Sequence, residues 1–186
     1  MPRKTLEEKE ESRVRILDSA AELIRKNGIE NTSVSDIMAA AGMTHGGFYR
    51  HYPSKEALVS EAIEKAFRSG LDAFEEEGAT PAEKAATYVQ NYLSDIHIET
   101  PEDGCPIPLL GTEVARGSDE WQSALRKGVT QATDGLSDGI PDLPRGEALV
   151  LLSTLVGSMV LARGLGEGEL REALLSSVRE ALQTKA

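Results

Sequence analysis

The chain has 186 residues, of which 40% are hydrophobic and 4% are aromatic. It can therefore bury a core of mainly Leu, Val, Ile and Ala, in one domain or in two small domains that share a core. Its formal net charge of −11 argues at first against a nucleic-acid partner. The single cysteine, Cys105, excludes an internal disulfide and fits a reducing compartment.

Two segments bear on the cellular location. The N-terminal sequence MPRKTLEEKEESR lacks the apolar segment of a secretory signal. The longest apolar run, Ala148–Ala162, has fifteen residues, fewer than the roughly 20 that span a bilayer. We therefore expect a cytoplasmic protein without a membrane partner.

The charge is unevenly distributed and suggests a division of the chain. Residues 1–55 contain nine Lys or Arg and eight Asp or Glu, a net charge of +1, whereas residues 56–186 contain eleven and twenty-three, a net charge of −12. Only the first part could approach a polyanion without strong repulsion. Solvated helix faces can produce the same asymmetry, so charge alone does not decide the function.

Helical periodicity covers nearly the whole chain, and we expect an all-α fold of about nine helices. The first helix carries an apolar face and ends at Asn27-Gly28; the face comprises Val14, Leu17, Ala21 and Ile24. Ser33 is a good N-cap for a second short helix, with Asp36 at its third position. Thr44 can cap a third short helix, which must end near Pro53.

Ser54 caps a long fourth helix, and the capping box Thr80-Pro81-Ala82-Glu83 begins a fifth that we expect to continue to Ile96. Three prolines and one glycine interrupt the helical pattern in the segment Glu99–Pro108. A short helix is then expected over Leu109–Arg116, and a longer one from Ser118 to Leu136. Two last helices are expected over about 146–163 and 167–183.

The second and third helices form a helix-turn-helix, joined by Ala41-Gly42-Met43 with Gly42 free to adopt a positive φ. Phe48 and Tyr52, four residues apart, are expected to face inward. The opposite side of the third helix then presents Thr44, His45, Gly46, Tyr49 and Arg50.

This third helix contains Gly46 and Gly47 in tandem, although glycine weakens a helix by about 1 kcal/mol relative to alanine. A recognition helix inserts its N-terminal end into the major groove, where a missing side chain lets the backbone approach DNA. Arg50 and His45 can reach base edges, and hydroxyl groups can contact phosphates. The alternative is that the glycines serve packing and the histidines are plain surface residues.

Residues 13–59, RVRILDSAAELIRKNGIENTSVSDIMAAAGMTHGGFYRHYPSKEALV, resemble the N-terminal DNA-binding domain of the TetR family of bacterial transcriptional repressors. The resemblance lies in Ile16–Leu23, Gly28, Thr32–Gly42 and Gly46–Leu58. It implies a DNA-binding domain over residues 1–55, with the fourth helix linking on, and an effector-binding and dimerisation domain over residues 56–186.

The resemblance also implies roles for single residues. Ser33 and Thr44 would touch phosphates at helix N-termini, and Lys55 would anchor a phosphate at the start of the fourth helix. The complete set of expected DNA-binding residues is Ser33, Thr44, His45, Gly46, Gly47, Tyr49, Arg50, His51 and Lys55. Tyr52 falls on a core position that is usually Phe in the family, so its hydroxyl needs a partner or an exposed edge.

In the family the last two helices of each subunit pair into a four-helix bundle. Here one helix offers an apolar stripe with small residues at Ser153 and Gly157, and the other offers a partner face. The stripe comprises Leu149, Leu152, Val156, Met159 and Val160, and the partner face comprises Leu170, Leu174, Val178 and Leu182. The alternative is that both helices only complete the core of one subunit.

The resemblance implies an effector pocket among the fourth to eighth helices. Candidate lining residues are Phe67, Phe74, Tyr88, Tyr92, His97, Cys105, Trp121 and Met159, each of which could equally be plain core. Cys105, within EDGCPIPLLGTE, resembles a cysteine in relatives that sense electrophiles and oxidants. At a helix N-terminus its thiol pKa would be lowered. Alternatively, Cys105 is a small buried apolar residue.

Two other functions compete with DNA binding. A di-iron enzyme needs Glu-x-x-His pairs, and none of the three histidines, His45, His51 and His97, has a Glu three residues earlier. No P-loop, G-x-S-x-G or zinc-spaced cluster occurs in the sequence, so we expect neither enzymatic activity nor a cofactor. The second rival is a helical interaction protein that does not bind DNA, which the acidic C-terminal part makes conceivable.

Overall fold

The computed structural model describes residues 6–71, 80–140 and 143–183. These residues form nine α-helices and two 3₁₀ segments, in the order α1 (Leu6–Asn27), α2 (Val34–Ala40), η1 (His45–Arg50), α3 (Lys55–Leu71), α4 (Pro81–Tyr92), α5 (Asp95–Glu99), η3 (Pro101–Asp103), α6 (Ile107–Arg116), α7 (Asp119–Gly139), α8 (Arg145–Leu165) and α9 (Glu169–Gln183). The described part of the chain is helical throughout, without strands, as the periodicity predicted.

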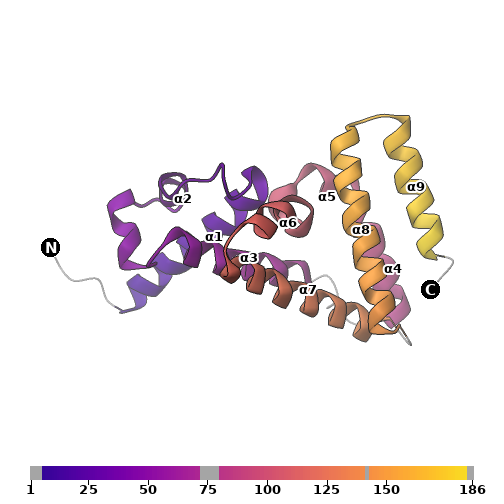
Figure 1. The fold of residues 1–186 in the computed structure, drawn as a ribbon, viewed down its shortest axis with the longest axis horizontal. Helices are drawn as coiled ribbons and strands as arrows, with labels where there is room; N and C mark the ends of the chain where they lie inside the picture. The colour runs from indigo at the N-terminus through magenta and orange to yellow at the C-terminus, as the bar shows by residue number, and fades with distance from the viewer. Residues whose placement is uncertain (1–5, 72–79, 141–142, 184–186) are drawn as a thin grey trace.

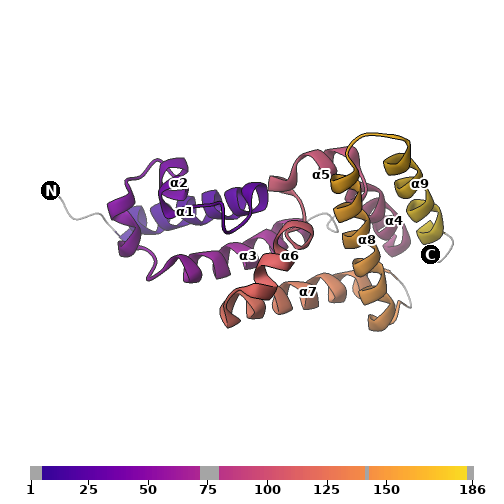
Figure 2. The ribbon, with the colours of Figure 1, turned by 45° about the horizontal axis from the view of Figure 1, so that its top comes forward.

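The helices form an elongated molecule with different elements at its two ends. Helices α1 and α2 and the start of α3 lie at one end, and α4, α8 and α9 lie at the other (Figure 1). Helix α7 runs between them along α3, and α6 lies in the middle of the molecule in both ribbon views (Figure 2). The segments proposed for DNA binding and for dimerisation are therefore well separated.

The N-terminal helices do not have a core of their own. Their buried cluster includes Ile16 and Ile24 of α1, Phe48 of η1 and Ile63 of α3, and it continues into Leu110 of α6. A second cluster joins α4, α5, α8 and α9, and a third joins α7 to α8. Because residues of α6 and α7 belong to the first cluster, a movement of these helices would be transmitted through the shared core to the helix-turn-helix.

Three predicted caps are confirmed, whereas Thr44, also expected to cap a helix, makes no side-chain bond at η1. Ser33 and Asp36 form a capping box at α2, Thr80 and Glu83 form one at α4, and the Ser118 side chain caps α7. At these positions a side chain satisfies backbone N–H groups within three residues.

Several sequence-based boundaries and faces were wrong. Val14 is 44% exposed, because the buried face of α1 runs through Ile16, Ala20 and Ile24. The helix expected to reach Ile96 ends at Tyr92, since Ser94 caps a new short helix, and Ile96 is 75% exposed on α5. Helix α6 begins at Ile107 rather than Leu109, because a proline is tolerated in a first turn. The predicted end of the fourth helix, including Phe74, lies outside the described residues.

Helix α8 is long and apolar enough, by length and composition, to cross a membrane. The same composition is found in core helices of globular proteins, and Leu152, Leu155 and Met159 are buried against the other helices. Two members of the predicted dimer stripe, Leu152 and Met159, therefore belong to the core of one subunit. Leu149 and Val160 of that stripe are exposed, at 43% and 46%.

Candidate DNA-binding surface and aromatic–thiol cluster

The turn between α2 and η1 is fixed by backbone geometry. Gly42 adopts φ +71°, a conformation that side-chain-bearing residues avoid. Its N–H donates to the Ala39 carbonyl at 3.0 Å, and the Met43 N–H donates to the Met38 carbonyl at 2.8 Å. This pair of bonds is a Schellman motif, and it ends α2 so that η1 leaves at a defined angle.

The third helix of the predicted domain is a six-residue 3₁₀ helix, η1, rather than an α-helix. Its bonds run from Gly47 N–H to the Thr44 carbonyl and from His51 N–H to the Phe48 carbonyl, both at 2.9 Å. Phe48 is fully buried and Tyr52 is 2% exposed, with ring centroids 6.1 Å apart. The predicted inward orientation of these two rings is therefore confirmed.

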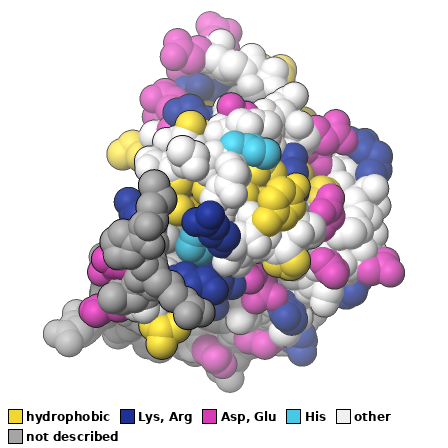
Figure 3. Space-filling view, turned by 90° about the vertical axis from the view of Figure 1, so that its left-hand side faces the viewer, with side chains coloured by type: hydrophobic (Ala, Val, Ile, Leu, Met, Phe, Trp, Pro, Cys, Tyr) yellow, Lys and Arg dark blue, Asp and Glu magenta, His cyan; other side chains and the backbone are white. Residues whose placement is uncertain are grey.

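The outward side of η1 carries five exposed positions: Thr44, His45 and Gly46 at its start and, one turn on, Tyr49 and Arg50. We call Thr44, His45, Gly46, Tyr49 and Arg50 the recognition surface. Tyr49 is 70% exposed, with its ring edge-on to Phe48 at 5.2 Å. Hydrophobic, basic and histidine side chains lie in the middle of this end of the molecule, and most acidic side chains lie toward its margin (Figure 3).

Packing within the described structure does not require a glycine at position 46. A Cβ built at Gly46 would meet no atom within 4 Å, and one built at Gly47 would make only an ordinary contact, 3.5 Å from the Met38 methyl carbon. Neither glycine has a positive φ. Packing inside the subunit therefore does not account for the pair, whereas open space outside η1 leaves room for a partner to approach the backbone.

The other expected DNA-binding residues are engaged inside the protein to different degrees. The Ser33 hydroxyl donates to Asp36 Oδ2 at 2.6 Å and accepts from the Asp36 N–H at 3.1 Å; the hydrogen bonds from Ser33 lower the pKa of the Asp36 carboxyl. Lys55 Nζ donates to the Ile29 carbonyl at 2.8 Å. His51 is half-buried behind the recognition surface. Thr44 makes no side-chain capping bond and is exposed.

The Tyr52 hydroxyl, expected to need a partner, is buried and has no hydrogen-bond partner among the described residues. The Arg13 guanidinium lies 4.9 Å from the centroid of the Tyr52 ring and also pairs with Glu61 at 2.6 Å. Burial, with a smaller contribution from Glu61, raises the pKa of Tyr52 to about 12. The phenol is therefore neutral at physiological pH.

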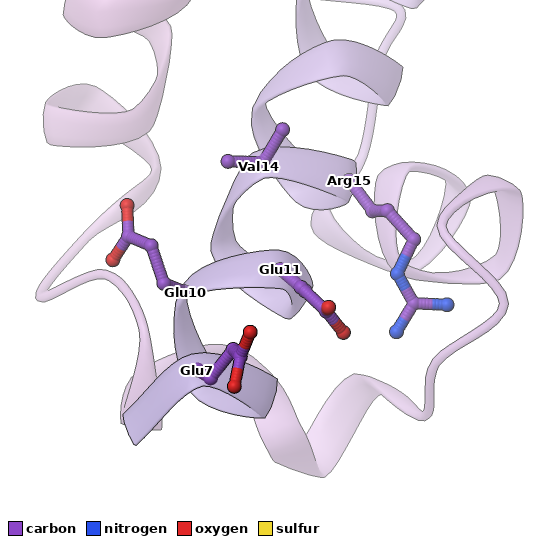
Figure 4. A pocket seen from close by; sticks show the side chains of 5 residues that line it. All are labelled: Glu7, Glu10, Glu11, Val14 and Arg15. Atoms are coloured by element: carbon purple, nitrogen blue, oxygen red, sulfur yellow. The ribbon is translucent and has the colours of Figure 1, made fainter. Parts of the chain in front are cut away.

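The expected effector residues divide into two groups. Tyr88, Tyr92, His97 and Cys105, which we call the aromatic–thiol cluster, lie together beside Met159 in the core of the C-terminal end. Phe67 and Trp121 instead belong to the core around α3 and α7. A surface pocket on α1 is lined by Glu7, Glu10, Glu11, Val14 and Arg15 and includes none of the expected effector residues (Figure 4).

His97 organises the cluster through both ring nitrogens. Nε2 accepts the Cys105 N–H at 3.0 Å, so the ring proton lies on Nδ1 and is donated to the Tyr92 carbonyl at 2.7 Å. Burial, together with the nearby Arg163, lowers the pKa of His97. The imidazole is thus held neutral, in one tautomer, between α4 and the segment before α6.

One buried nitrogen in this region lacks a hydrogen-bond partner among the described residues. Arg163 donates to the His97 carbonyl at 2.7 Å and to the Ile98 carbonyl at 3.1 Å, but its Nη1 is unpaired. The Cys105 thiol lies beside Tyr92, and burial raises its pKa. The expectation of a lowered thiol pKa was wrong, because burial outweighs the hydrogen bonds from the Tyr92 hydroxyl and from the Ile107 N–H at the start of α6.

The geometry defines a helix-turn-helix protein with an outward-facing recognition helix. Residues 16–62 match the family model for bacterial regulatory proteins of the tetR family. The transcriptional regulator AcrR of Shigella flexneri is 44% identical over 64 residues. This match covers 34% of the present chain and 30% of AcrR. The chain thus spans about a third of that relative.

Other relatives match over greater lengths. The uncharacterised helix-turn-helix regulator Rv0196 of Mycobacterium tuberculosis is 28% identical over 188 residues, covering 90% of this chain and 96% of Rv0196. The repressor DhaR of Mycobacterium sp. is 28% identical over 150 residues, covering 70% and 73%. The crystal structure of reduced Escherichia coli NemR has a TM-score of 0.75 at 21% identity and covers 91% and 95%, which shows the same fold. Residues 16–62 are thus a DNA-binding domain of the TetR family type, and the whole chain shares the fold of NemR.

Proposed function

We propose that this protein is a cytoplasmic repressor that binds a palindromic operator as a homodimer and is released by a small molecule or by modification of Cys105. The observation that carries DNA binding is the recognition surface. It is outward-facing, carries an exposed Tyr49 and Arg50, and leaves the space above Gly46 open. A helix N-terminus with this composition suits phosphate and base-edge contacts. The match to the repressor DhaR supports repression.

A homodimer would place two recognition surfaces on successive half-sites. The exposed side of α8 and α9 at the far end supports this assignment. It carries Leu149, Val150, Val160, Leu161 and Leu170, each at least 43% exposed, and a Cβ at Gly157 would meet no atom of the subunit. A continuous apolar face of this kind is costly in a monomer and is typical of an oligomer interface.

Equilibrium sedimentation would test the dimer. Val160→Lys places a charge on the proposed interface and is expected to yield a monomer. Val14→Lys is the matched control, because Val14 is 44% exposed and Val160 is 46% exposed; that variant should keep the wild-type mass. A Val160→Lys protein that sediments as a dimer would exclude this interface.

A gel shift with the DNA upstream of the protein's own gene would test operator binding. A repressor should shift the fragment with a steep loss of affinity at higher salt, because bound phosphates release counterions. Tyr49→Ala should weaken the shift without lowering thermal stability, since that side chain is mostly exposed. A helical interaction protein would give no shift at any salt concentration.

The release mechanism is the second part of the proposal. Tyr92, His97 and Cys105 connect α4 to the segment that leads into α6, so an adduct on the sulfur would disturb the start of α6. With an activated alkene as the electrophile, the S–C bond forms as the C=C π bond breaks, and the thiol proton passes by way of solvent to the resulting carbanion. If a Cys105→Ser protein still releases its operator on treatment with a mild electrophile, modification of Cys105 is not the signal.

A further inference from the structure

The loop between α1 and α2 is held from two sides at the two successive peptide groups that flank Ile29. Glu113, on α6, accepts the Ile29 N–H through Oε2 at 2.8 Å and the Glu30 N–H through Oε1 at 3.1 Å. Lys55, at the start of α3, donates to the Ile29 carbonyl at 2.8 Å. The Ile29 side chain is fully buried in the N-terminal core. We call Glu113, Lys55 and the Ile29 and Glu30 backbone the loop clamp.

The backbone of the loop is shaped to admit the Glu113 carboxylate. Gly28 adopts φ +84°, and a Cβ there would lie 3.0 Å from both carboxylate oxygens of Glu113. The Thr32 hydroxyl donates to the Gly28 carbonyl at 2.7 Å, and Ser33 follows directly as the cap of α2. The loop is therefore a short rigid connection between the carboxylate on α6 and the first helix of the helix-turn-helix.

Hydrogen bonds from backbone N–H groups to a carboxylate are charge-assisted and stronger than neutral ones. Two of them on one carboxylate, together with the bond from Lys55, fix the loop relative to both α3 and α6. Because η1 is connected to α2 by a rigid turn, the position of α2 also sets the orientation of the recognition surface.

We propose that Glu113 is a positioning residue for DNA binding, which holds α2 and η1 in the binding orientation from α6. The proposal rests on the proposed function, because it assigns a control point to the same DNA-binding surface. Helix α6 begins two residues after Cys105, so a displacement of its start would strain the clamp. Lys55 keeps two further ammonium donors for other partners, since it spends one on the Ile29 carbonyl.

The test compares Glu113→Ala, Glu113→Gln and Glu83→Ala in the full chain. Glu83 is the matched control, because its carboxylate accepts the Thr80 N–H at 2.8 Å in a cap at the other end of the molecule. DNA affinity is measured on fragments selected from random sequence, and hydrogen exchange is measured at the Ile29 and Glu30 amides.

We expect Glu113→Ala to speed exchange at both amides at least tenfold and to lower DNA affinity at least fivefold. Glu113→Gln, which keeps one carbonyl acceptor, should recover part of both losses, and Glu83→Ala should change neither. Faster exchange with an unchanged affinity would overturn the positioning role, as would equal affinity losses in Glu113→Ala and Glu83→Ala. If the wild-type protein binds no DNA, the proposed function fails, and an unchanged exchange rate at both amides would separately refute the clamp.

Discussion

Tyr49 and Tyr92 illustrate how differently the two ends of this molecule use polar aromatic side chains. Tyr49 is 70% exposed on the recognition surface, whereas Tyr92 is 4% exposed, and its hydroxyl is hydrogen-bonded to the Cys105 thiol inside the core. The side chains of the recognition surface are already exposed to solvent. The aromatic–thiol cluster is packed, so a small molecule that enters it must displace existing contacts.

The largest expected contrast is between two arginines. Arg163→Ala removes the donors to the His97 and Ile98 carbonyls, and losing bonds from a charged group costs about 1.5–3 kcal/mol each. We expect the free energy of unfolding to fall by at least about 2 kcal/mol. Arg50→Ala, at an exposed position, should change it by less than about 0.5 kcal/mol while weakening DNA binding. Chemical denaturation of both variants measures the contrast, and equal stability losses would contradict it.

The neutral His97 predicts a loss of stability in acid. Because burial lowers the pKa of His97 in the folded protein, the unfolded chain takes up a proton first as the pH falls below the ordinary value of about 6.5. The stability that His97 contributes is therefore present above about pH 6.5 and is lost as the pH falls toward the folded pKa.

His97→Asn should remove this part of the acid dependence, which denaturation at several pH values would measure. His45→Asn, at an exposed position, serves as the control. The same acid slope in the wild type and in His97→Asn would show that His97 is not held neutral by the fold.

The smallest expected effect concerns Tyr52. Tyr52→Phe removes a buried hydroxyl that has no hydrogen-bond partner among the described residues, and the free energy of unfolding should stay equal or rise by up to about 1 kcal/mol. Since the pKa of Tyr52 is raised to about 12, the wild type should lose stability relative to Tyr52→Phe between about pH 10 and pH 12. A Tyr52→Phe protein destabilised by more than about 1 kcal/mol at neutral pH would reveal a partner for the hydroxyl.

Features that depend on neighbouring residues were predicted well. The capping boxes at Ser33 and Thr80, the Gly42 turn and the inward pair Phe48 and Tyr52 all involve residues within a few positions of one another. Local geometry and helical periodicity are sufficient to define them. The helix-turn-helix, and with it the recognition surface, was therefore readable from a short stretch of sequence.

Features that depend on packing between distant segments were not readable. The bond between Glu113 and Ile29 joins residues 84 positions apart, and the only sequence signal was Gly28, which was interpreted as a helix stop. Phe67 and Trp121 were grouped with the effector residues although they pack around α3 and α7. The pKa of Cys105 follows from burial, which a single sequence does not reveal, so the helix N-terminus alone predicted the wrong direction.

The central claim is that the backbone at Gly46 approaches DNA, and Gly46→Ala tests it most directly. The equilibrium affinity for a selected DNA fragment would be measured by fluorescence anisotropy for the wild type, Gly46→Ala and Gly111→Ala. Gly111 is a helical control, where a Cβ makes only an ordinary contact at 3.7 Å from the Ile107 side chain. We predict that Gly46→Ala is at least as stable as the wild type and binds DNA at least tenfold more weakly, with Gly111→Ala unaffected. Wild-type affinity in a folded Gly46→Ala protein would contradict the claim.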